Sequence, residues 1–358
     1  KSTFESRIWL DKDPSEKKAT MLKLADLMEK NREELALLDT VETGRAFNNY
    51  YEDSIPKSIE VVRYFAEAID KQYDEVITPR ANAFATITSA PLGVVGLITP
   101  WNDPLVPAMW KMVPALLMGN SVVMKPAEQS SFSLLKLAEL TRKADIPVGV
   151  LNIVTGYGET AGKPLALHQE VAGIFFTGSS ETGKMILQYA GQSNMKRVGL
   201  ECGGKSAFIV SNKCREIKLA AETLAKNIFY NQGQICSAPS RAILHEDIKS
   251  ELMVYLKEEA NKYNPQNPFE VDNIVGCLIS NKQKERIEEY IQKGKNEKLD
   301  FFQAPDKFQD GVCISPIIFD NVDPYSTLAQ EEIFGPVLAV IGVSSMKEAI
   351  EIGNNTKF

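Results

Sequence analysis

The sequence predicts an α/β protein with parallel β-sheets flanked by helices, and two observations support that fold class. Between residues 93 and 200, short apolar runs alternate with helical stretches, which is typical of a parallel sheet with helical crossovers. After Gly204 a second series of apolar and helical segments follows. The 358 residues are enough for two or three domains, each with a core of its own.

The composition is that of a globular protein and argues against several classes. Hydrophobic residues make up 44% and charged residues 24% of the chain, which are ordinary values. The net charge of −7 argues against a general nucleic-acid binder. No apolar run approaches the roughly 20 residues of a membrane helix, and no signal peptide is visible. Five scattered cysteines and two histidines match no metal-ligand spacing. We therefore expect no metal, no membrane or nucleic-acid partner, and a reducing, cytoplasmic location.

Helices and a ribbon are expected before the first sheet. The motif DPSE at 13–16 has the pattern of a capping box, and the helical periodicity after it continues to Gly44. A second helix is expected over 58–70. The stretch VITPRANAFATITSAP predicts a two-stranded ribbon within 73–91, with its turn near 80–82.

Four apolar runs then predict strands of a parallel sheet. They are GVVGLIT at 93–99, SVVMK at 121–125, GVLNIV at 149–154 and VAGIFF at 171–176. Helices are expected at 104–118, near 131–143, after Gly158 and from Glu181. Because ligands bind beyond the carboxyl ends of parallel strands, the residues after these runs are site candidates. They read PWND, KPAE, TGYG and TGSSETG.

The second series predicts another α/β unit. Its expected strands are KSAFIVS at 205–211 and SRAILH at 240–245, and its helices are at 216–230, 246–263 and 280–295. The motif CGGK supplies a flexible joint, so we place the domain boundary at 203–204.

Two loops are candidates for binding a nucleotide. The loop GSSETG at 178–183 lies between a predicted strand and helix, and a helix N-terminus suits a phosphate, although an ordinary helix cap explains it equally well. The stretch TGYGETAG misses the G-x-G-x-x-G fingerprint by one residue and is weak support. A carboxylate such as Glu128, next to Lys125 after a strand, accepts hydrogen bonds from ribose hydroxyls and repels a 2′-phosphate. That pattern favours NAD over NADP, although a surface pair at a turn is an equal alternative.

The stretch FYNQGQICSAPSR holds one cysteine, Cys236, in an amide-rich setting. Such a cysteine is usually a small hydrophobe, but a thiolate can also attack an aldehyde carbonyl and form an adduct with an oxyanion. Asn102, directly after a strand, is a candidate donor to that oxyanion. Glu201, at a strand end before Gly203, is a candidate base for water. An Asx turn and a plain strand-end carboxylate are the structural alternatives for these two residues.

Six motifs in the same order resemble those of the NAD(P)-dependent aldehyde dehydrogenase superfamily. They are TPWNDP at 99–104, GNSVVMKPAE at 119–128, FTGSSETGK at 176–184, LECGGKS at 200–206, NQGQIC at 231–236 and EEIFGPV at 331–337. Within it, YFAEAIDK, SNMKRV and FYNQGQICSA resemble the γ-glutamyl-γ-aminobutyraldehyde dehydrogenases and related ω-amino-aldehyde enzymes. The resemblance implies a Rossmann-type NAD-binding domain over 1–203, with the ribbon at 73–91 used in oligomerisation, and a catalytic domain over 204–358.

The resemblance also implies a role for each matching residue. Cys236 is expected to be the nucleophile, Asn102 with the N–H of Cys236 to form the oxyanion hole, and Glu201 to activate water. The residues expected to bind NAD are Thr99, Pro100, Trp101, Lys125, Pro126, Glu128, Gly158, Gly178, Ser179, Gly183, Cys202, Glu332 and Phe334. Among these, Lys125 and Glu128 are assigned to the adenosine ribose, Ser179 to the pyrophosphate, Glu332 to the nicotinamide ribose and Phe334 to the nicotinamide ring.

Three features depart from the family pattern or mark a substrate preference. Cys202 stands where the family has Leu or Met, but its backbone carbonyl is unaffected. Asp103 replaces an aromatic residue of the substrate tunnel and is expected to attract a cationic substrate, with a helix cap facing outward as the alternative. Glu67 and Asp70 share a helical face, where the amino-aldehyde enzymes carry acidic residues, and a solvated face is the alternative.

We therefore predict NAD-dependent oxidation of an aldehyde, with a small amino- or acylamino-aldehyde as the substrate. The alternatives are broad aliphatic or betaine aldehyde oxidation, a CoA-acylating relative, which Glu201 disfavours, and a non-catalytic protein that reuses the fold. The chain begins at Lys1 and ends in GNNTKF. We expect both ends to be cut from a longer protein that forms a homodimer or homotetramer.

Overall fold

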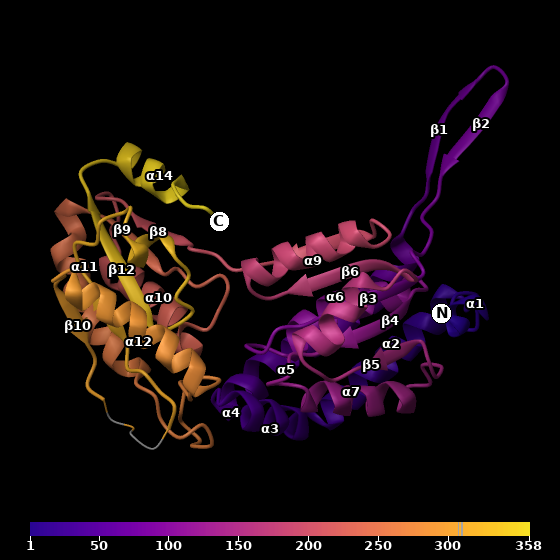
Figure 1. Cartoon of the computed structure of the whole chain (residues 1–358), viewed down its shortest axis with the longest axis horizontal. Coiled ribbons are helices and arrows are strands. Elements are labelled where there is room, and N and C mark those ends of the chain that lie inside the picture. Colours follow the sequence, from indigo (N-terminus) through magenta and orange to yellow (C-terminus); the bar gives the residue numbers. More distant parts are fainter. Residues whose placement is uncertain (307, 309–310) are drawn as a thin grey trace. The chain divides into compact units, whose positions relative to one another are not determined.

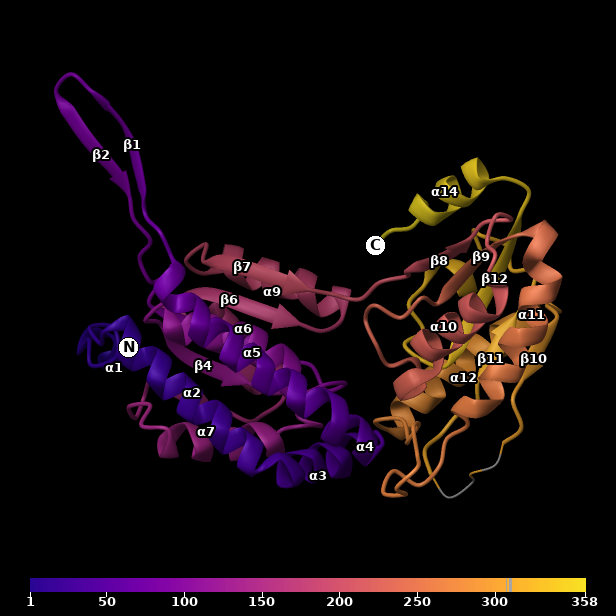
Figure 2. The same cartoon turned by 180° about the vertical axis from the view of Figure 1, so that it is seen from behind.

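The protein, a computed structural model in which residues 1–306, 308 and 311–358 are described, contains two compact units (Figures 1 and 2). The first unit comprises Lys1–Glu42 and Tyr51–Glu201, and the second comprises Thr43–Tyr50 and Cys202–Phe358. None of the helices in these described residues is long and apolar enough to cross a membrane.

The segment Thr43–Tyr50 belongs to the second unit, although it lies within the first domain assigned from the sequence. Its backbone is paired with distant parts of the chain: the N–H of Phe47 donates to the carbonyl of Pro268 at 2.9 Å, and the N–H of Cys277 donates to that of Gly44 at 2.6 Å. Such long-range pairing leaves no signal in local sequence pattern.

Five parallel strands form the sheet of the first unit, in the spatial order β5-β4-β3-β6-β7. They are β3 (Val94–Ile98), β4 (Ser121–Lys125), β5 (Leu151–Ile153), β6 (Val171–Thr177) and β7 (Arg197–Glu201). β3 is buried along its whole length, as expected of a central parallel strand. The first four are the apolar runs expected from the sequence, and β7 ends at Glu201 as expected.

Helices cover this sheet. They are α1 (Ser2–Glu5), α2 (Pro14–Lys30), α3 (Arg32–Thr43), α5 (Ile55–Ala68), α6 (Leu105–Leu117), α7 (Phe132–Lys143), α8 (Lys163–Leu167) and α9 (Ser180–Gln192). α6 lies against β3 and β4, α7 against β5, and α9 against β6 and β7. α5 packs against both α2 and α6.

The N-terminal helical region is confirmed at its start and wrong in its middle. The capping box forms: the side chain of Asp13 accepts a hydrogen bond from the backbone of the first helical turn, and the side chain of Glu16 accepts one from the backbone N–H of Asp13. The single helix expected to run to Gly44 is broken at Asn31, whose side chain donates to the carbonyl of Leu27 at 2.7 Å. An asparagine that competes for a backbone carbonyl in this way ends a helix readily. The helix that follows this break, α3, stops before Gly44, which has a φ of +75°.

The helix expected after Gly158 is another correction. Residues 158–162 form one π-helical turn, and the α-helix after it, α8, has only five residues. The glycines at both ends of this turn and Pro164 at the start of α8 weaken any longer regular helix.

The ribbon is confirmed as a hairpin of β1 (Glu75–Arg80) and β2 (Ala83–Ile87). It projects away from the sheet of its own unit (Figures 1 and 2). Four of its apolar side chains are exposed: Val76, Ile77, Phe84 and Ile87.

The second unit contains a mixed sheet in the order β10-β11-β12-β9-β8. Its strands are β8 (Ala207–Val210), β9 (Arg241–His245), β10 (Phe301–Gln303), β11 (Ile317–Phe319) and β12 (Val337–Val343). Only the β10–β11 pair of this sheet is antiparallel. The helices are α4 (Phe47–Asn49), α10 (Ile217–Phe229), α11 (Glu246–Ala260), α12 (Asn281–Asn296), α13 (Thr327–Gln330) and α14 (Met346–Asn354).

Each face of this second sheet has its own core. Successive strand residues point to opposite faces, so Leu244 of β9 packs in one cluster with Leu224 of α10, while Ile243 packs in the other with Ile287 of α12. The sheet is thus buried between helices on both sides, which fixes the loops at its edges.

Candidate active site

The strand order of the first unit marks a candidate ligand site. The chain enters the sheet at its centre with β3, adds β4 and β5 on one side, and then returns to place β6 beside β3. The order reverses between β3 and β6, and doubly wound sheets bind ligands at such a point, beyond the carboxyl ends of the strands. The segments that flank this point are 99–102 after β3 and 178–179 after β6. Both contain residues expected from the sequence.

The loop between β6 and α9 forms a capped helix N-terminus, which is the candidate anion site. Ser179 is the N-cap of α9, and its Oγ accepts a hydrogen bond from the backbone N–H of Thr182 at 3.2 Å. The backbone N–H of Gly178 donates to the carbonyl of Glu201 at 3.1 Å. A Cβ on Gly178 would lie 2.5 Å from the ring of Phe176, so any larger residue here would have to displace that ring. α9 has 13 residues and presents its positive dipole end at this loop.

The end of β4 carries the expected lysine and glutamate. Lys125 is buried, and its Nζ donates to the carbonyl of Pro126 at 2.9 Å and to Oε2 of Glu128 at 3.2 Å. The carboxylate of Glu128 is exposed. The buried lysine therefore fixes the position of a carboxylate whose remaining lone pairs face solvent and suit hydroxyl donors.

The segment after β3 contains Thr99, Pro100, Trp101 and Asn102. The first two are buried and the other two are half-buried, and the N–H of Thr99 donates to the carbonyl of Lys125 at 3.2 Å. That bond ties this segment to the end of β4. Asn102 thus lies on a short bend between β3 and α6, within the first unit.

Asp103 is directed toward the protein. Its Oδ2 accepts a hydrogen bond from the hydroxyl of Ser54 at 3.0 Å, and α6 begins two residues later, at Leu105. The alternative of an outward-facing helix cap does not fit this bond. The carboxylate is half-buried, so a cation that approached it would be only partly solvated.

Glu67 and Asp70 lie on an exposed face and have lysine partners. Nζ of Lys18 lies 2.6 Å from Oε2 of Glu67 and 3.7 Å from Oδ2 of Asp70. Lys71 pairs with Asp70 at 2.6 Å and lowers the pKa of that carboxyl. Two ammonium groups already occupy these acids, which weakens the idea that they anchor a substrate ammonium.

Cys236 follows a loop that is held by buried amides. Asn231, Gln232 and Gly233 all have positive φ, at +49°, +52° and +68°. A Cβ on Gly233 would lie 2.2 Å from the carbonyl oxygen of Gly335, so only glycine fits. Gln234 is buried, and its Oε1 accepts from the N–H of Ile279 at 3.1 Å. The loop is therefore rigid where the thiol is attached.

Gln232 contributes most to this rigidity. It is 1% exposed, its Nε2 donates to the carbonyl of Gly276 at 2.6 Å, and its Oε1 accepts from the N–H of Ile314 at 2.9 Å. Cys236 itself is exposed. An exposed thiol on a strained, amide-braced loop is unusual for a packing residue and is typical of a reactive one.

Glu332 lies beside the glycine pair of the second unit. Its Oε1 accepts from the N–H of Gly204 at 3.1 Å, and a Cβ on Gly203 would lie 2.0 Å from its Oε2. A Cβ on Gly204 would in turn contact the carbonyl of Cys236 at 3.3 Å. The structure thus brings Glu332, this glycine pair and the Cys236 loop together.

The remaining expected residues lie as follows. Phe334 has a φ of +58°, and its carbonyl accepts from Nε2 of Gln283 at 2.9 Å. Gly158 is exposed on the π-helical turn, Gly183 is buried in α9 and Cys202 is half-buried. Asn102 and Glu201 belong to the first unit, and Cys236, Glu332 and Phe334 to the second.

Sequence reasoning missed the buried lysine Lys205. It is 2% exposed, its Nζ has no hydrogen-bond partner among the described residues, and burial lowers its pKa to about 7. Arg241 adds to the lowering, and Glu332 opposes it. Its place in the motif LECGGKS was noted, but no role was assigned to this lysine. The braces Gln232 and Gln234 were also missed, although their motif was noted.

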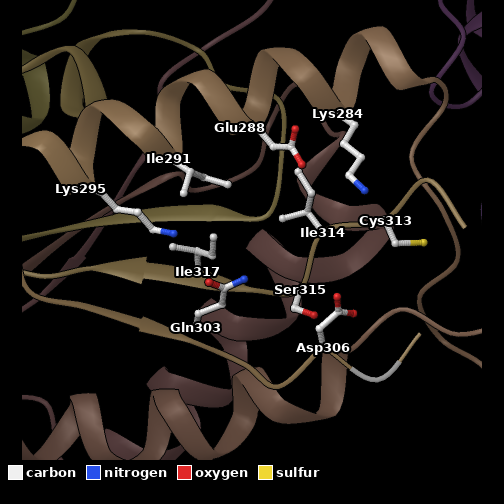
Figure 3. Close-up of a pocket in the computed structure, with 10 residues that line it drawn as sticks. All are labelled: Lys284, Glu288, Ile291, Lys295, Gln303, Asp306, Cys313, Ile314, Ser315 and Ile317. Carbon is white, nitrogen blue, oxygen red and sulfur yellow. The ribbon is translucent and has the colours of Figure 1, made fainter. Parts of the chain in front are cut away.

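No cluster of three or more metal-ligating side chains occurs among the described residues. A cavity of about 200 Å³ in the second unit is lined by residues of α12, β10, β11 and the segment before β11 (Figure 3). None of the expected site residues lines it.

Comparison with known proteins agrees with these features. The sequence model described as "Aldehyde dehydrogenase family" matches residues 1–358. The chain is 42% identical over 358 residues to the NADP/NAD-dependent aldehyde dehydrogenase PuuC of Escherichia coli K12, covering 100% of this chain and 72% of PuuC. It is 38% identical over 355 residues to the aminoacetaldehyde dehydrogenase of Pseudomonas aeruginosa, covering 99% and 71%.

A solved structure gives the same result for the fold. The crystal structure of γ-glutamyl-γ-aminobutyraldehyde dehydrogenase from Burkholderia cenocepacia matches with a TM-score of 0.97 and 41% identity. It covers 99% of this chain and 72% of that chain.

Proposed function

Because the chain belongs to the aldehyde dehydrogenase family, we propose that it oxidises an aldehyde to a carboxylic acid with NAD. The observation that carries the proposal is the exposed thiol of Cys236 on a loop braced by Gln232 and Gln234. The overall reaction converts aldehyde, NAD⁺ and water into acid, NADH and a proton. Both curated relatives reported above are named as aldehyde dehydrogenases.

The first unit fits NAD. Its strand order reverses where α9 begins, so the N–H groups around Ser179 suit the pyrophosphate. The carboxylate of Glu128, held by Lys125, suits the adenosine ribose hydroxyls. In the second unit, Glu332 would accept hydrogen bonds from the nicotinamide ribose and Phe334 would pack against the nicotinamide. The bound cofactor supplies a hydride acceptor.

Cys236 is the nucleophile in this proposal. Its thiolate attacks the aldehyde carbonyl and forms a tetrahedral thiohemiacetal with a negatively charged oxygen. The side-chain amide of Asn102 and the backbone N–H of Cys236 donate to that oxygen. Loss of a hydride from the adduct leaves a thioester on Cys236.

Glu201 then acts as the base that activates water to hydrolyse the thioester. A CoA-acylating enzyme transfers its acyl group to a thiol and does not need this carboxylate, so Glu201 supports hydrolysis. A non-catalytic reuse of the fold requires neither the thiol nor the base, and the chain carries both.

The proposed substrate is a small amino- or acylamino-aldehyde. The half-buried carboxylate of Asp103, directed toward Ser54, supports a cationic substrate end, because opposite charges attract most strongly where water is partly excluded. Two relatives are named for amino-aldehydes. Glu67 and Asp70 are already paired with Lys18, so they do not support the amino-aldehyde assignment. Broad aliphatic or betaine aldehyde oxidation is therefore the second candidate.

The assembly and location follow the same proposal. The exposed apolar side chains of the ribbon, such as Val76 and Phe84, suit pairing with a second copy of the chain, as expected for a homodimer or homotetramer. A cytoplasmic location fits five cysteines of which none forms a disulfide.

The test is NADH formation by the purified protein with ω-amino-aldehydes of three and four carbons and with plain aliphatic aldehydes of equal length. Turnover that prefers the amino-aldehydes, and that loses this preference in Asp103→Asn, supports the substrate assignment. Equal turnover with both series retains the reaction and rejects the assigned role of Asp103. No turnover with either series rejects the proposed function.

A further inference from the structure

Two cysteines outside the proposed site lie in direct contact. Sγ of Cys313 donates to Sγ of Cys277 at 3.1 Å, across 36 residues of chain. A disulfide needs a separation of about 2.05 Å, so the two sulfurs have to approach by about 1 Å to form the bond. Both residues are half-buried in the second unit. Neither belongs to the motifs that identify the family.

The two thiols are not equivalent. The hydrogen bond from Cys313 lowers the pKa of Cys277, and the same bond with burial raises the pKa of Cys313. Cys277 is therefore the sulfur that carries negative charge more readily, and a thiolate is the attacking species in thiol–disulfide exchange.

A small molecule can approach Cys313, and the sulfur of Cys277 lies 3.1 Å from the sulfur of Cys313 without lining the cavity itself. Cys313 lines the 200 Å³ cavity together with Lys284 and Lys295 of α12, and Figure 3 shows the ammonium of Lys284 on the Cys313 side of it. Two lysines, Lys284 and Lys295, and two acids, Glu288 and Asp306, line the cavity, so its charges balance and suit a polar molecule that carries groups of both signs.

The pair also touches the brace of the Cys236 loop. Gln232 is held by the carbonyl of Gly276 and the N–H of Ile314, which are the immediate neighbours of Cys277 and Cys313. A bond between the two sulfurs would connect covalently the two segments that hold Gln232.

From this geometry we propose that Cys277 and Cys313 form a reversible dithiol–disulfide site that is oxidised by a polar low-molecular-weight disulfide. The thiolate of Cys277 attacks one sulfur of that disulfide, forms a mixed disulfide and releases one small thiolate. Cys313 then loses its proton to solvent, and its sulfur attacks Sγ of Cys277. This step releases the second small thiol. Two protein thiols are oxidised, and one small disulfide is reduced to two thiols.

The test uses glutathione disulfide as the probe and needs no turnover, so it is independent of the proposed function. All proteins carry Cys236→Ser, which removes the exposed thiol and leaves four cysteines. Thiols are counted after denaturation, and peptides are mapped by mass spectrometry before and after treatment. Cys313→Ser removes the second attacking thiol. Cys214→Ser is the matched control, because Cys214 is half-buried in the same unit and packs against the α10 core.

The parent protein should lose two thiols, gain a peptide pair joined through Cys277 and Cys313, and recover both thiols with dithiothreitol. Cys313→Ser should instead retain glutathione on Cys277, and Cys214→Ser should behave as the parent does. The proposal is overturned if Cys277 and Cys313 both stay reduced in the parent, or if Cys313→Ser loses the same two thiols without an adduct.

Discussion

The carboxylate of Glu332 accepts a hydrogen bond from the backbone N–H of Gly204 at 3.1 Å, and Gly203 leaves no room for a side chain beside it. The pair Gly203–Gly204 therefore sets the position of the Glu332 carboxylate. In the proposed function this carboxylate binds the nicotinamide ribose, so the glycine pair affects the binding of the cofactor and not that of the substrate.

Gly203→Ala is expected to weaken NAD binding. Its Cβ would lie 2.0 Å from Oε2 of Glu332, so the carboxylate must move away from the ribose. Loss of a charged hydrogen bond corresponds to about a tenfold rise in the Kd for NAD, measured by calorimetry. Gly191→Ala is the control, since a Cβ there meets nothing within 4 Å. Equal NAD binding by both variants would show that Glu332 does not contact the cofactor.

Gln232→Ala is expected to destabilise the second unit and to slow turnover. It leaves the N–H of Ile314 unpaired in the interior and the carbonyl of Gly276 with a weak contact from Sγ of Cys313 at 4.0 Å, at a cost of about 1–3 kcal/mol in the free energy of unfolding. The displaced Cys236 loop should lower kcat about tenfold or more. Urea unfolding and steady-state kinetics measure the two effects. The exposed Gln292→Ala, on α12, should change neither; full activity in Gln232→Ala would argue against the brace.

Lys205 predicts a pH dependence of stability. Its pKa is lowered to about 7 in the folded protein from 10.5, so between these pH values the unfolded chain binds a proton that the folded chain does not. The free energy of unfolding should therefore rise as pH increases from about 7 to about 10, by at most about 4 kcal/mol. In Lys205→Met this rise should disappear, whereas the exposed Lys347→Met should retain it. If the free energy of unfolding of the wild-type protein stays constant or falls over this pH range, the lowered pKa of Lys205 is contradicted.

Glu128→Gln should relax the proposed preference for NAD over NADP. The exposed carboxylate that Lys125 holds repels a 2′-phosphate, and removal of one like charge is worth about 1 kcal/mol near water. The ratio of kcat/KM for NADP to that for NAD should rise about fivefold. Glu139→Gln on α7, an exposed glutamate that also pairs with lysines, serves as the control. An unchanged ratio would place the adenosine ribose elsewhere.

Local pattern predicted much of the fold. Buried parallel strands such as β3 and β4 are short apolar runs, and their limits were predicted within one residue because burial on both faces leaves a continuous signal. The break at Asn31 was missed because one asparagine in a long periodic stretch is ambiguous until its side chain finds the carbonyl of Leu27. β10 and β11 were not predicted because three residues each are too few to give a strand pattern, and β12 was also missed although it is a buried apolar run.

The candidate site was predicted less evenly. Cys236, Asn102 and Glu201 were identified through motifs, and their roles remain predictions. The braces of the Cys236 loop could not be foreseen, because the partners of Gln232 lie 44 and 82 residues away along the chain. The burial of Lys205 likewise depends on tertiary packing. Its sequence neighbours are two glycines and a serine, and they give no apolar signal.

The central claim is that Cys236 carries the acyl group and that Glu201 releases it. The most direct measurement is mass spectrometry of Glu201→Gln after mixing with an aldehyde and NAD. The account predicts one equivalent of NADH in a burst, followed by an acyl adduct on the peptide that contains Cys236, with no adduct in Cys236→Ala. Sustained turnover by Glu201→Gln at the wild-type rate, or an adduct on another residue, would contradict it.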